Sequence, residues 1–119
     1  MIIGIGTDII EISRVAEAAR RKYFLKRLFT EREIDYLKGK APESMAGYFC
    51  AKEAVAKALG TGFSGIALTD IEIVKNNSVP GVILHGAAKA IADSKGTKNI
   101  HLSISHCREY ATAVAILEG

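Results

Sequence analysis

The sequence predicts an α+β domain with antiparallel strands, and three observations support this. The alanine-rich residues 42–59 have the composition of a long helix, with Pro42 at its first position and Gly60 just after its end. Residues 70–84 and 100–117 each contain two apolar or alternating runs joined by a short turn, which indicates β-hairpins. Helical and strand patterns do not alternate as βαβ units would require, so a parallel sheet is not expected.

The part of the chain before the long helix predicts one strand and two shorter helices. Residues 1–5 form a β-rich run, so Asp8 is expected at or just past the end of a strand. Residues 13–22 predict a helix whose first residue, a serine, is a good N-cap. Residues 23–29 form an aromatic and aliphatic patch. Residues 30–39 open with a Thr-Glu-Arg-Glu capping box and end in glycine, which indicates a short helix.

Size and composition predict a single domain, residues 1–119. A chain of 119 residues can remove roughly two-thirds of its unfolded surface from water. No apolar run approaches the ~18 residues that cross a bilayer, and no charged segment precedes the N-terminal isoleucines. We therefore expect a cytoplasmic protein without a membrane partner. The two cysteines, Cys50 and Cys107, are expected to be free thiols in that reducing compartment, and they lack a zinc-site spacing.

Charge is distributed unevenly along the chain. The net charge is +3, yet residues 14–40 alone hold nine Lys or Arg against four Asp or Glu, a local +5. Such a basic segment favours an acidic partner. Nucleic acid is not expected, because the segment has no array of aromatic side chains on which bases could stack.

Two glycine-rich stretches do not match the common nucleotide-binding motifs. Residues 60–65 follow a helix rather than a strand and lack the Gly-Lys-Ser/Thr ending of a Walker A loop. Residues 4–6 lack the third glycine of a dinucleotide fingerprint. Neither stretch therefore predicts a P-loop or a Rossmann fold.

Three charged residues form a candidate site. Asp8 and Glu53 come from different elements, as the carboxylate ligands of Mg²⁺ often do, and Lys57 lies one helical turn beyond Glu53. Mg²⁺ commonly takes one or two carboxylates together with substrate phosphates, and a lysine can meet a phosphate. From these residues alone, an ordinary ion pair between Glu53 and Lys57 on a solvated helix face remains an alternative.

Four sequence blocks stand out along the chain. The first is Gly-Thr-Asp-Ile-Ile-Glu-Ile at residues 6–12, followed by Arg14. The second is Phe-Thr-x-x-Glu at residues 29–33. The third, at residues 49–62, contains the Ala-Lys-Glu-Ala sequence and ends in Gly-Thr-Gly. The fourth is His-Leu-Ser-Ile-Ser-His and the following Tyr-Ala, within residues 101–111. Together the blocks extend over nearly the whole chain, and they resemble those of the bacterial holo-(acyl-carrier-protein) synthases, the small 4′-phosphopantetheinyl transferases.

The resemblance implies a reaction and a catalytic set. Members of this family transfer 4′-phosphopantetheine from coenzyme A to a serine of apo acyl carrier protein and release adenosine 3′,5′-bisphosphate, a step that serves fatty acid biosynthesis. It implies an antiparallel sheet wrapped on the long central helix, Mg²⁺ as cofactor held by Asp8 and Glu53, and Lys57 on the pyrophosphate; these three would be catalytic. The residue that accepts the serine proton stays open between a metal-bound water, Glu53 and a histidine.

The resemblance also implies the binding partners. It implies a homotrimer with active sites between subunits, and docking of the acidic carrier protein on the first helix, for which we single out Arg14 and Arg21. The residues expected along coenzyme A are Lys57, Gly60, Pro80, Ser105 and His106.

Two positions depart from the family pattern. Tyr48 stands where the family usually has arginine, and Ser78-Val79 precede Pro80 where glycine and a basic or polar residue are common. Both lie in regions that the family associates with coenzyme A. A non-catalytic trimeric module that captures an acidic partner is the alternative function, in which Asp8 and Glu53 would only form structural ion pairs.

Overall fold

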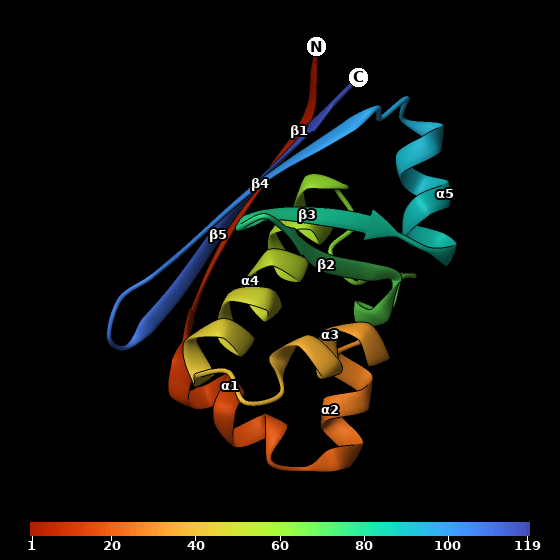
Figure 1. Cartoon of the computed structure of the whole chain (residues 1–119). Coiled ribbons are helices and arrows are strands. Elements are labelled where there is room, and N and C mark those ends of the chain that lie inside the picture. The colour runs from red at the N-terminus through yellow and green to blue at the C-terminus, as the bar shows by residue number, and fades with distance from the viewer.

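Helix α4, Pro42–Ala58, lies in the middle of the molecule and the other elements surround it (Figure 1). The computed structural model describes all 119 residues. In chain order the elements are β1 (Ile2–Glu11), α1 (Ile12–Ala19), α2 (Lys22–Leu28), α3 (Glu31–Leu37), α4, the 3₁₀ turn η1 (Leu68–Asp70), β2 (Ile71–Asn76), β3 (Val79–Leu84), α5 (Gly86–Ser94), β4 (Asn99–His106) and β5 (Tyr110–Glu118).

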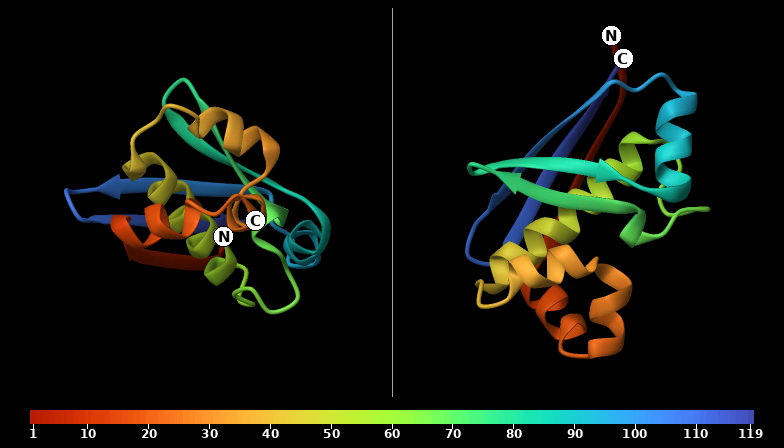
Figure 2. Two further views of the ribbon diagram at one scale, coloured as in Figure 1. Left: turned by 90° about the horizontal axis from the view of Figure 1, so that it is seen from below. Right: turned by 45° about the vertical axis from the view of Figure 1, so that its right-hand side comes forward.

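Two antiparallel sheets pack around α4. The first has the strand order β1-β5-β4, and the second is the hairpin β2-β3. Helices α1 to α3 gather at one end of α4 and α5 lies towards the other, as Figure 2 also shows. The prediction of an α+β fold, with an antiparallel sheet wrapped on a long central helix, is confirmed.

The three-stranded sheet approaches α4 closely because the residues between them are small. Ala111, Ala113 and Ala115 of β5 are buried and alternate with the half-buried residues of the same strand. On β1, a Cβ atom at Gly6 would overlap the carbonyl oxygen of Ala54, and one at Gly4 would overlap that of Ala58. The glycines of β1 are therefore required because the strand packs directly against the backbone of the helix.

A single apolar core fills the space between the sheets and helices. It contains 22 buried hydrophobic residues in one cluster, many of them alanines of α4 and β5. No helix of the chain is both long enough and apolar enough to cross a membrane. Both cysteines are free, as expected; Cys50 is buried in α4 and Cys107 is exposed in the turn after β4.

Strand β1 is longer than expected, and Asp8 lies within it. The strand continues to Glu11, which is paired with Tyr110 of β5, while Asp8 is paired with Ala113. The prediction that Asp8 sits at or past the strand end is therefore wrong. The Gly-Thr-Asp composition is typical of a turn. Here the glycine, Gly6, allows close packing against α4, and pairing with β5 keeps the segment extended.

The predicted helix of residues 13–22 also differs in the structure. Helix α1 begins at Ile12, with Glu11 as the N-cap residue, and it ends at Ala19. Ser13 is therefore inside the helix and is not its N-cap. The amide of Ile12, the first residue of the helix, donates to the carbonyl of Glu109, just before β5. A separate helix, α2, follows where only an apolar patch was expected, so four helices precede the first hairpin and not three.

The local signals at the other helix ends are confirmed. Thr30 and Glu33 form the expected capping box at the start of α3. Pro42 is the first residue of α4, and Gly60 after its end has φ of +86°, a left-handed conformation that favours glycine. Both predicted hairpins are present.

Candidate active site

Strand β1 and helix α4 bring Asp8, Glu53 and Lys57 to one cavity of about 320 Å³. Asp8 faces the helix in the alternation of β1, and Glu53 and Lys57 lie one turn apart on α4, so the three side chains converge. The residues that line this catalytic cavity are Asp8, Ile9, Ile10, Glu11, Arg14, Phe49, Glu53, Lys57 and Tyr110.

Lys57 is held loosely. Its ammonium lies 3.3 Å from Oδ1 of Asp8 and donates to the carbonyl of Thr7 at 3.0 Å. The Lys57 side chain is 52% exposed, whereas that of Asp8 is 15% exposed. An ion pair in such a setting contributes little to stability, so the ammonium can turn towards an anion in the cavity.

Glu53 is the less satisfied of the two carboxylates. Partial burial raises the pKa of Glu53, and the nearby charge of Asp8 raises it further, while Lys57 partly opposes the shift. No hydrogen bond or ion pair within the chain engages its oxygens. A carboxylate that is partly desolvated, close to a second carboxylate and without a donor is well suited to receive a cation.

Cys50 lies behind this pair of carboxylates and is not a nucleophile. Its thiol donates to the carbonyl of Ala111 at 3.3 Å. Burial first, and Asp8 second, raise the pKa of Cys50 to about 12, so the thiol stays protonated at neutral pH.

The chain's own carboxylates do not complete a metal site. No group of three or more His, Cys, Asp and Glu residues is arranged to hold a metal ion. Asp8 and Glu53 alone could hold Mg²⁺, because that ion keeps several waters and takes substrate phosphates as further ligands.

The other residues expected along coenzyme A lie elsewhere on the chain. Pro80 and His106 line a second cavity of about 310 Å³, together with Tyr48 and Lys75, and this cavity shares no lining residue with the catalytic one. Ser105 is exposed on β4 and lines neither cavity. Within one chain, these residues are therefore not brought together with Asp8.

Gly60 lies at the C-terminal end of α4, beside a lysine from another helix. A Cβ atom at this position would lie 3.1 Å from Nζ of Lys95. The left-handed backbone favours glycine at this position.

Tyr48, the departure noted in the sequence, packs against a neighbouring tyrosine. Its ring stacks on that of Tyr36 with the centroids 5.4 Å apart, and its side chain is buried. Burial, with Tyr36 as the next contributor, raises its pKa. Tyr48 and Pro80 line the same cavity as Lys75, a basic side chain for which no role was predicted from the sequence.

Arg14 and Arg21 line one surface hollow of about 630 Å³, with Ser13, Glu17, Ala18 and Phe24. The prediction that both arginines share the first helix is wrong, because α1 ends at Ala19 and Arg21 lies just before α2. They nevertheless face the same hollow. Arg14 also lines the catalytic cavity, so the two depressions are adjacent.

Five residues that line the catalytic cavity had no site role assigned from the sequence: Ile9, Ile10, Glu11, Phe49 and Tyr110. Glu11 and Tyr110 are register partners across β1 and β5. They lie about a hundred residues apart in the sequence, so no local signal predicts that they pair.

Comparison with known proteins identifies close relatives. A sequence model of the 4′-phosphopantetheinyl transferase superfamily matches residues 4–115. A holo-(acyl-carrier-protein) synthase of Clostridium perfringens is 52% identical over 127 aligned residues, which cover 100% of this chain and 96% of the relative.

Solved structures agree with this similarity. The holo-(acyl-carrier-protein) synthase of Neisseria meningitidis matches with a TM-score of 0.89 at 30% identity, covering 100% of both chains. That of Helicobacter pylori, solved in complex with coenzyme A, matches with a TM-score of 0.85 at 34% identity, covering 96% of this chain and 99% of that one.

Proposed function

Since the chain belongs to the 4′-phosphopantetheinyl transferase superfamily, we propose that the cavity around Asp8, Glu53 and Lys57 is its active site. The chain transfers the 4′-phosphopantetheine group of coenzyme A to a serine of apo acyl carrier protein. The observation that supports the location is the convergence of two carboxylates and a lysine in one cavity that borders the basic hollow of Arg14.

Asp8 and Glu53 are the proposed ligands of Mg²⁺. The fit rests on Glu53, a partly buried carboxylate near Asp8 without a partner of its own. When bound, Mg²⁺ would neutralise charge on the pyrophosphate of coenzyme A and on the leaving bisphosphate.

Lys57 supplies the second positive charge at the pyrophosphate. Its side chain is half exposed and lines the cavity. The serine hydroxyl of the carrier gives up its proton to a base and its oxygen attacks the β-phosphorus, which bears pantetheine. A new phosphorus–oxygen bond to serine forms while the bond to the bridging oxygen breaks, so adenosine 3′,5′-bisphosphate leaves with the electron pair. A charge fixed beside that bridge stabilises the transition state more than the ground state.

Coenzyme A binding is proposed to use two subunits. The residues expected along it, Pro80 and His106, lie in a cavity separate from that of Lys57, and Gly60 and Ser105 lie outside both. The outer face of the three-stranded sheet also exposes Ile5 and Ile9, each about two-thirds accessible. A homotrimer that covers this apolar face and brings the Pro80 cavity of one subunit to the Asp8 cavity of the next would complete the site.

Mixed oligomers test the shared site. Glu53→Gln and His106→Ala subunits, each inactive alone, should regain activity when refolded together, because some interfaces then combine an intact Glu53 with an intact His106. A monomeric mass by light scattering at micromolar concentration, or no regain in the mixture, would contradict the shared site.

The acidic carrier protein is proposed to dock at the hollow of Arg14 and Arg21. Reversal of both arginines to Glu should raise the KM for the carrier about tenfold or more and flatten its salt dependence, since charge steers the encounter. The KM for coenzyme A should stay nearly unchanged. If the KM for the carrier stays within a few-fold of that of the unaltered protein at every salt concentration, this hollow is not the docking surface.

We also propose that residues 1–119 work as one domain in the cytoplasm, in support of fatty acid biosynthesis. The single apolar core and the two free thiols support this proposal.

One experiment tests the function. The protein is incubated with coenzyme A, Mg²⁺ and apo acyl carrier protein, and the carrier is weighed by mass spectrometry. A gain of one phosphopantetheine is expected, with none on a carrier whose acceptor serine is replaced by alanine. Chelation of the metal should abolish the gain in mass. If the gain persists under chelation, the Mg²⁺ assignment is wrong but the transfer reaction stands.

A further inference from the structure

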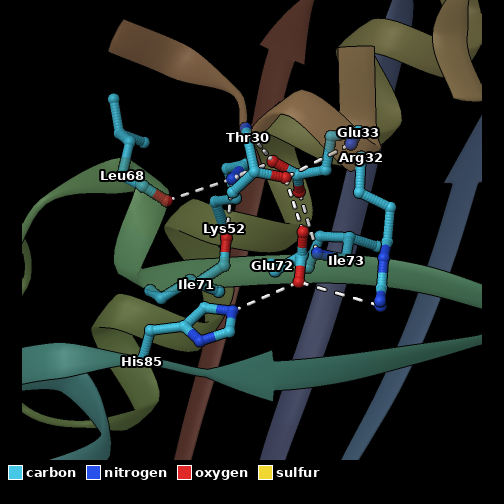
Figure 3. A network of polar contacts seen from close by, with 9 residues as sticks. All are labelled: Thr30, Arg32, Glu33, Lys52, Leu68, Ile71, Glu72, Ile73 and His85. Carbon is cyan, nitrogen blue, oxygen red and sulfur yellow. Dashed lines mark hydrogen bonds and ion pairs between the residues drawn. The ribbon is translucent and has the colours of Figure 1, made fainter. Parts of the chain in front are cut away.

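The residue immediately before Glu53, Lys52, carries a fully buried charge. The side chain of Lys52 is fully buried, and its ammonium contacts Oε1 of Glu33 at 2.6 Å. The ammonium also donates to the carbonyl of Ile71 at 2.6 Å and to that of Leu68 at 3.0 Å (Figure 3). Its three protons therefore have three acceptors, from α3, η1 and the first residue of β2.

The carboxylate of Glu33 is equally well satisfied. Oε1 accepts from the amide of Thr30 at 2.8 Å as well as from Lys52, and Oε2 accepts from the amide of Ile73 at 2.8 Å. The side chain of Glu33 is fully buried. Around it, the hydroxyl of Thr30 donates to Glu72, which also contacts His85 (Figure 3). The Lys52–Glu33 pair thus fastens α4 to α3 and β2.

Few large side chains specify the rotation of α4. The helix is buried nearly all round, and half of its ten buried residues are alanines: Ala46, Ala51, Ala54, Ala56 and Ala58. Alanine methyl groups interlock little with their surroundings, so the larger buried side chains, Lys52 among them, carry most of the preference for one rotation. A buried charged pair with fixed acceptors can specify one arrangement among such alternatives.

The rotation of α4 decides what Glu53 faces. Successive helical residues are separated by roughly 100°, so the anchoring of Lys52 towards α3 and β2 directs Glu53 and Lys57 away from it. They point to β1, where Gly4 and Gly6 let the strand come close enough for Asp8 to meet them.

We propose that Lys52 is a positioning residue: its buried ion pair with Glu33 sets the rotation of α4 and thereby directs Glu53 towards Asp8. The inference rests on the proposed assignment of Asp8 and Glu53 as metal ligands. Lys52 does not touch the reacting atoms; it acts through the geometry of the carboxylate pair.

The test compares two variants matched in stability loss. Lys52→Met keeps the length of the side chain and removes the ammonium. Leu37→Ala opens a cavity at a buried position of α3 without touching the contacts of Lys52. For each variant we would measure the melting temperature, kcat, the KM for coenzyme A, and Mn²⁺ affinity by electron paramagnetic resonance, which needs no turnover.

Lys52→Met should weaken Mn²⁺ binding about tenfold or more and lower kcat by a similar factor, as loss of support for metal ligands does, with the KM for coenzyme A nearly unchanged. Leu37→Ala should lower the melting temperature and leave Mn²⁺ affinity and kcat within about twofold, since it removes no hydrogen-bond or ion-pair partner of Lys52 or Glu33. Mn²⁺ affinity and kcat that are as little changed in Lys52→Met as in Leu37→Ala would overturn the proposal.

If Lys52→Met does not fold, Glu33→Gln replaces it. This variant keeps the volume of the side chain and leaves Lys52 its two carbonyl contacts, so a smaller loss of Mn²⁺ affinity and kcat is expected in the same pattern; unchanged values would overturn the proposal. If the unaltered protein transfers phosphopantetheine but binds no Mn²⁺, only the metal assignment fails. The positioning role is then decided by kcat alone, in the same comparison with Leu37→Ala.

Discussion

The chain contains two pairs of an acid and a lysine on opposite sides of α4, and they differ in almost every physical respect. Lys52 and Glu33 lie 2.6 Å apart, both fully buried. Lys57 and Asp8 lie 3.3 Å apart, at 52% and 15% exposure. Every polar atom of the first pair has a partner within the protein, whereas Glu53, beside the second pair, has none.

The difference shows how one helix can separate structure from chemistry. A buried and saturated pair has no capacity left for a ligand, and removing either member leaves the other charge buried without compensation. A half-exposed pair with an unpartnered carboxylate beside it adds little to stability and remains free to bind phosphate and metal. The same residue types therefore serve rigidity on one side of α4 and form the proposed active site on the other.

The largest expected effect is on stability, and it contrasts the two lysines. Lys52→Met should lower the free energy of unfolding by about 3–5 kcal/mol, because Glu33 is left buried and unpaired. Lys57→Met should lower it by less than about 1 kcal/mol, because half of the Lys57 side chain is exposed to water. Urea denaturation of both variants measures the contrast. Similar losses for the two would remove the distinction between the pairs.

On the catalytic side, Glu53→Gln should have the largest effect on activity. The substitution removes a charged oxygen at nearly constant volume, so the fold should persist while kcat falls about a hundredfold or more, since loss of a residue that only supports a metal ligand already costs about 10–100-fold. Circular dichroism controls for folding. Near-normal activity at low Mg²⁺ would contradict the role of Glu53 as a ligand.

Lys57→Ala should reduce kcat/KM roughly 10- to 100-fold, which corresponds to the 1.5–3 kcal/mol of one hydrogen bond to a charged group. The matched control is Lys89→Ala, a lysine in an exposed ion pair with Asp93 that lines neither cavity and should change kcat/KM much less. Unchanged kinetics in Lys57→Ala would indicate that Lys57 only forms an ion pair with Asp8 and does not contact the substrate.

The smallest expected effect concerns the outer end of the network around Lys52. Burial by itself would raise the pKa of Glu72, but hydrogen bonds from Thr30 and His85 and the charge of Arg32 outweigh it and lower the pKa below the ordinary 4.5. A lowered pKa in the folded state stabilises the protein above pH 4.5, and this contribution is lost as the pH falls through the folded pKa.

Glu72→Gln should therefore lower the free energy of unfolding by about 1 kcal/mol at pH 7, with a smaller difference from the unaltered protein at pH 3. Urea denaturation at the two pH values measures this change. If the two proteins differ in free energy of unfolding by the same amount at pH 7 and pH 3, the charge of Glu72 does not contribute to stability.

Local sequence signals determined much of the secondary structure. The capping box at Thr30, the proline at position 42 and the glycine at position 60 depend on hydrogen bonds and backbone angles within a few residues, so they could be predicted without the fold. The four motif blocks identified the family and named Asp8, Glu53 and Lys57 as a set, which the structure brings to one cavity.

The tertiary structure alone decided the rest, because those features depend on partners far away in the chain. Strand β1 extends to Glu11 because Tyr110, about a hundred residues later, pairs with it. Pro80 and His106 resembled parts of the same site as Lys57, yet packing places them in another cavity. No local sequence signal marks Lys52 and Glu33 as buried; they are buried because α3, η1 and β2 close over α4 and supply every acceptor and donor that the two charges require.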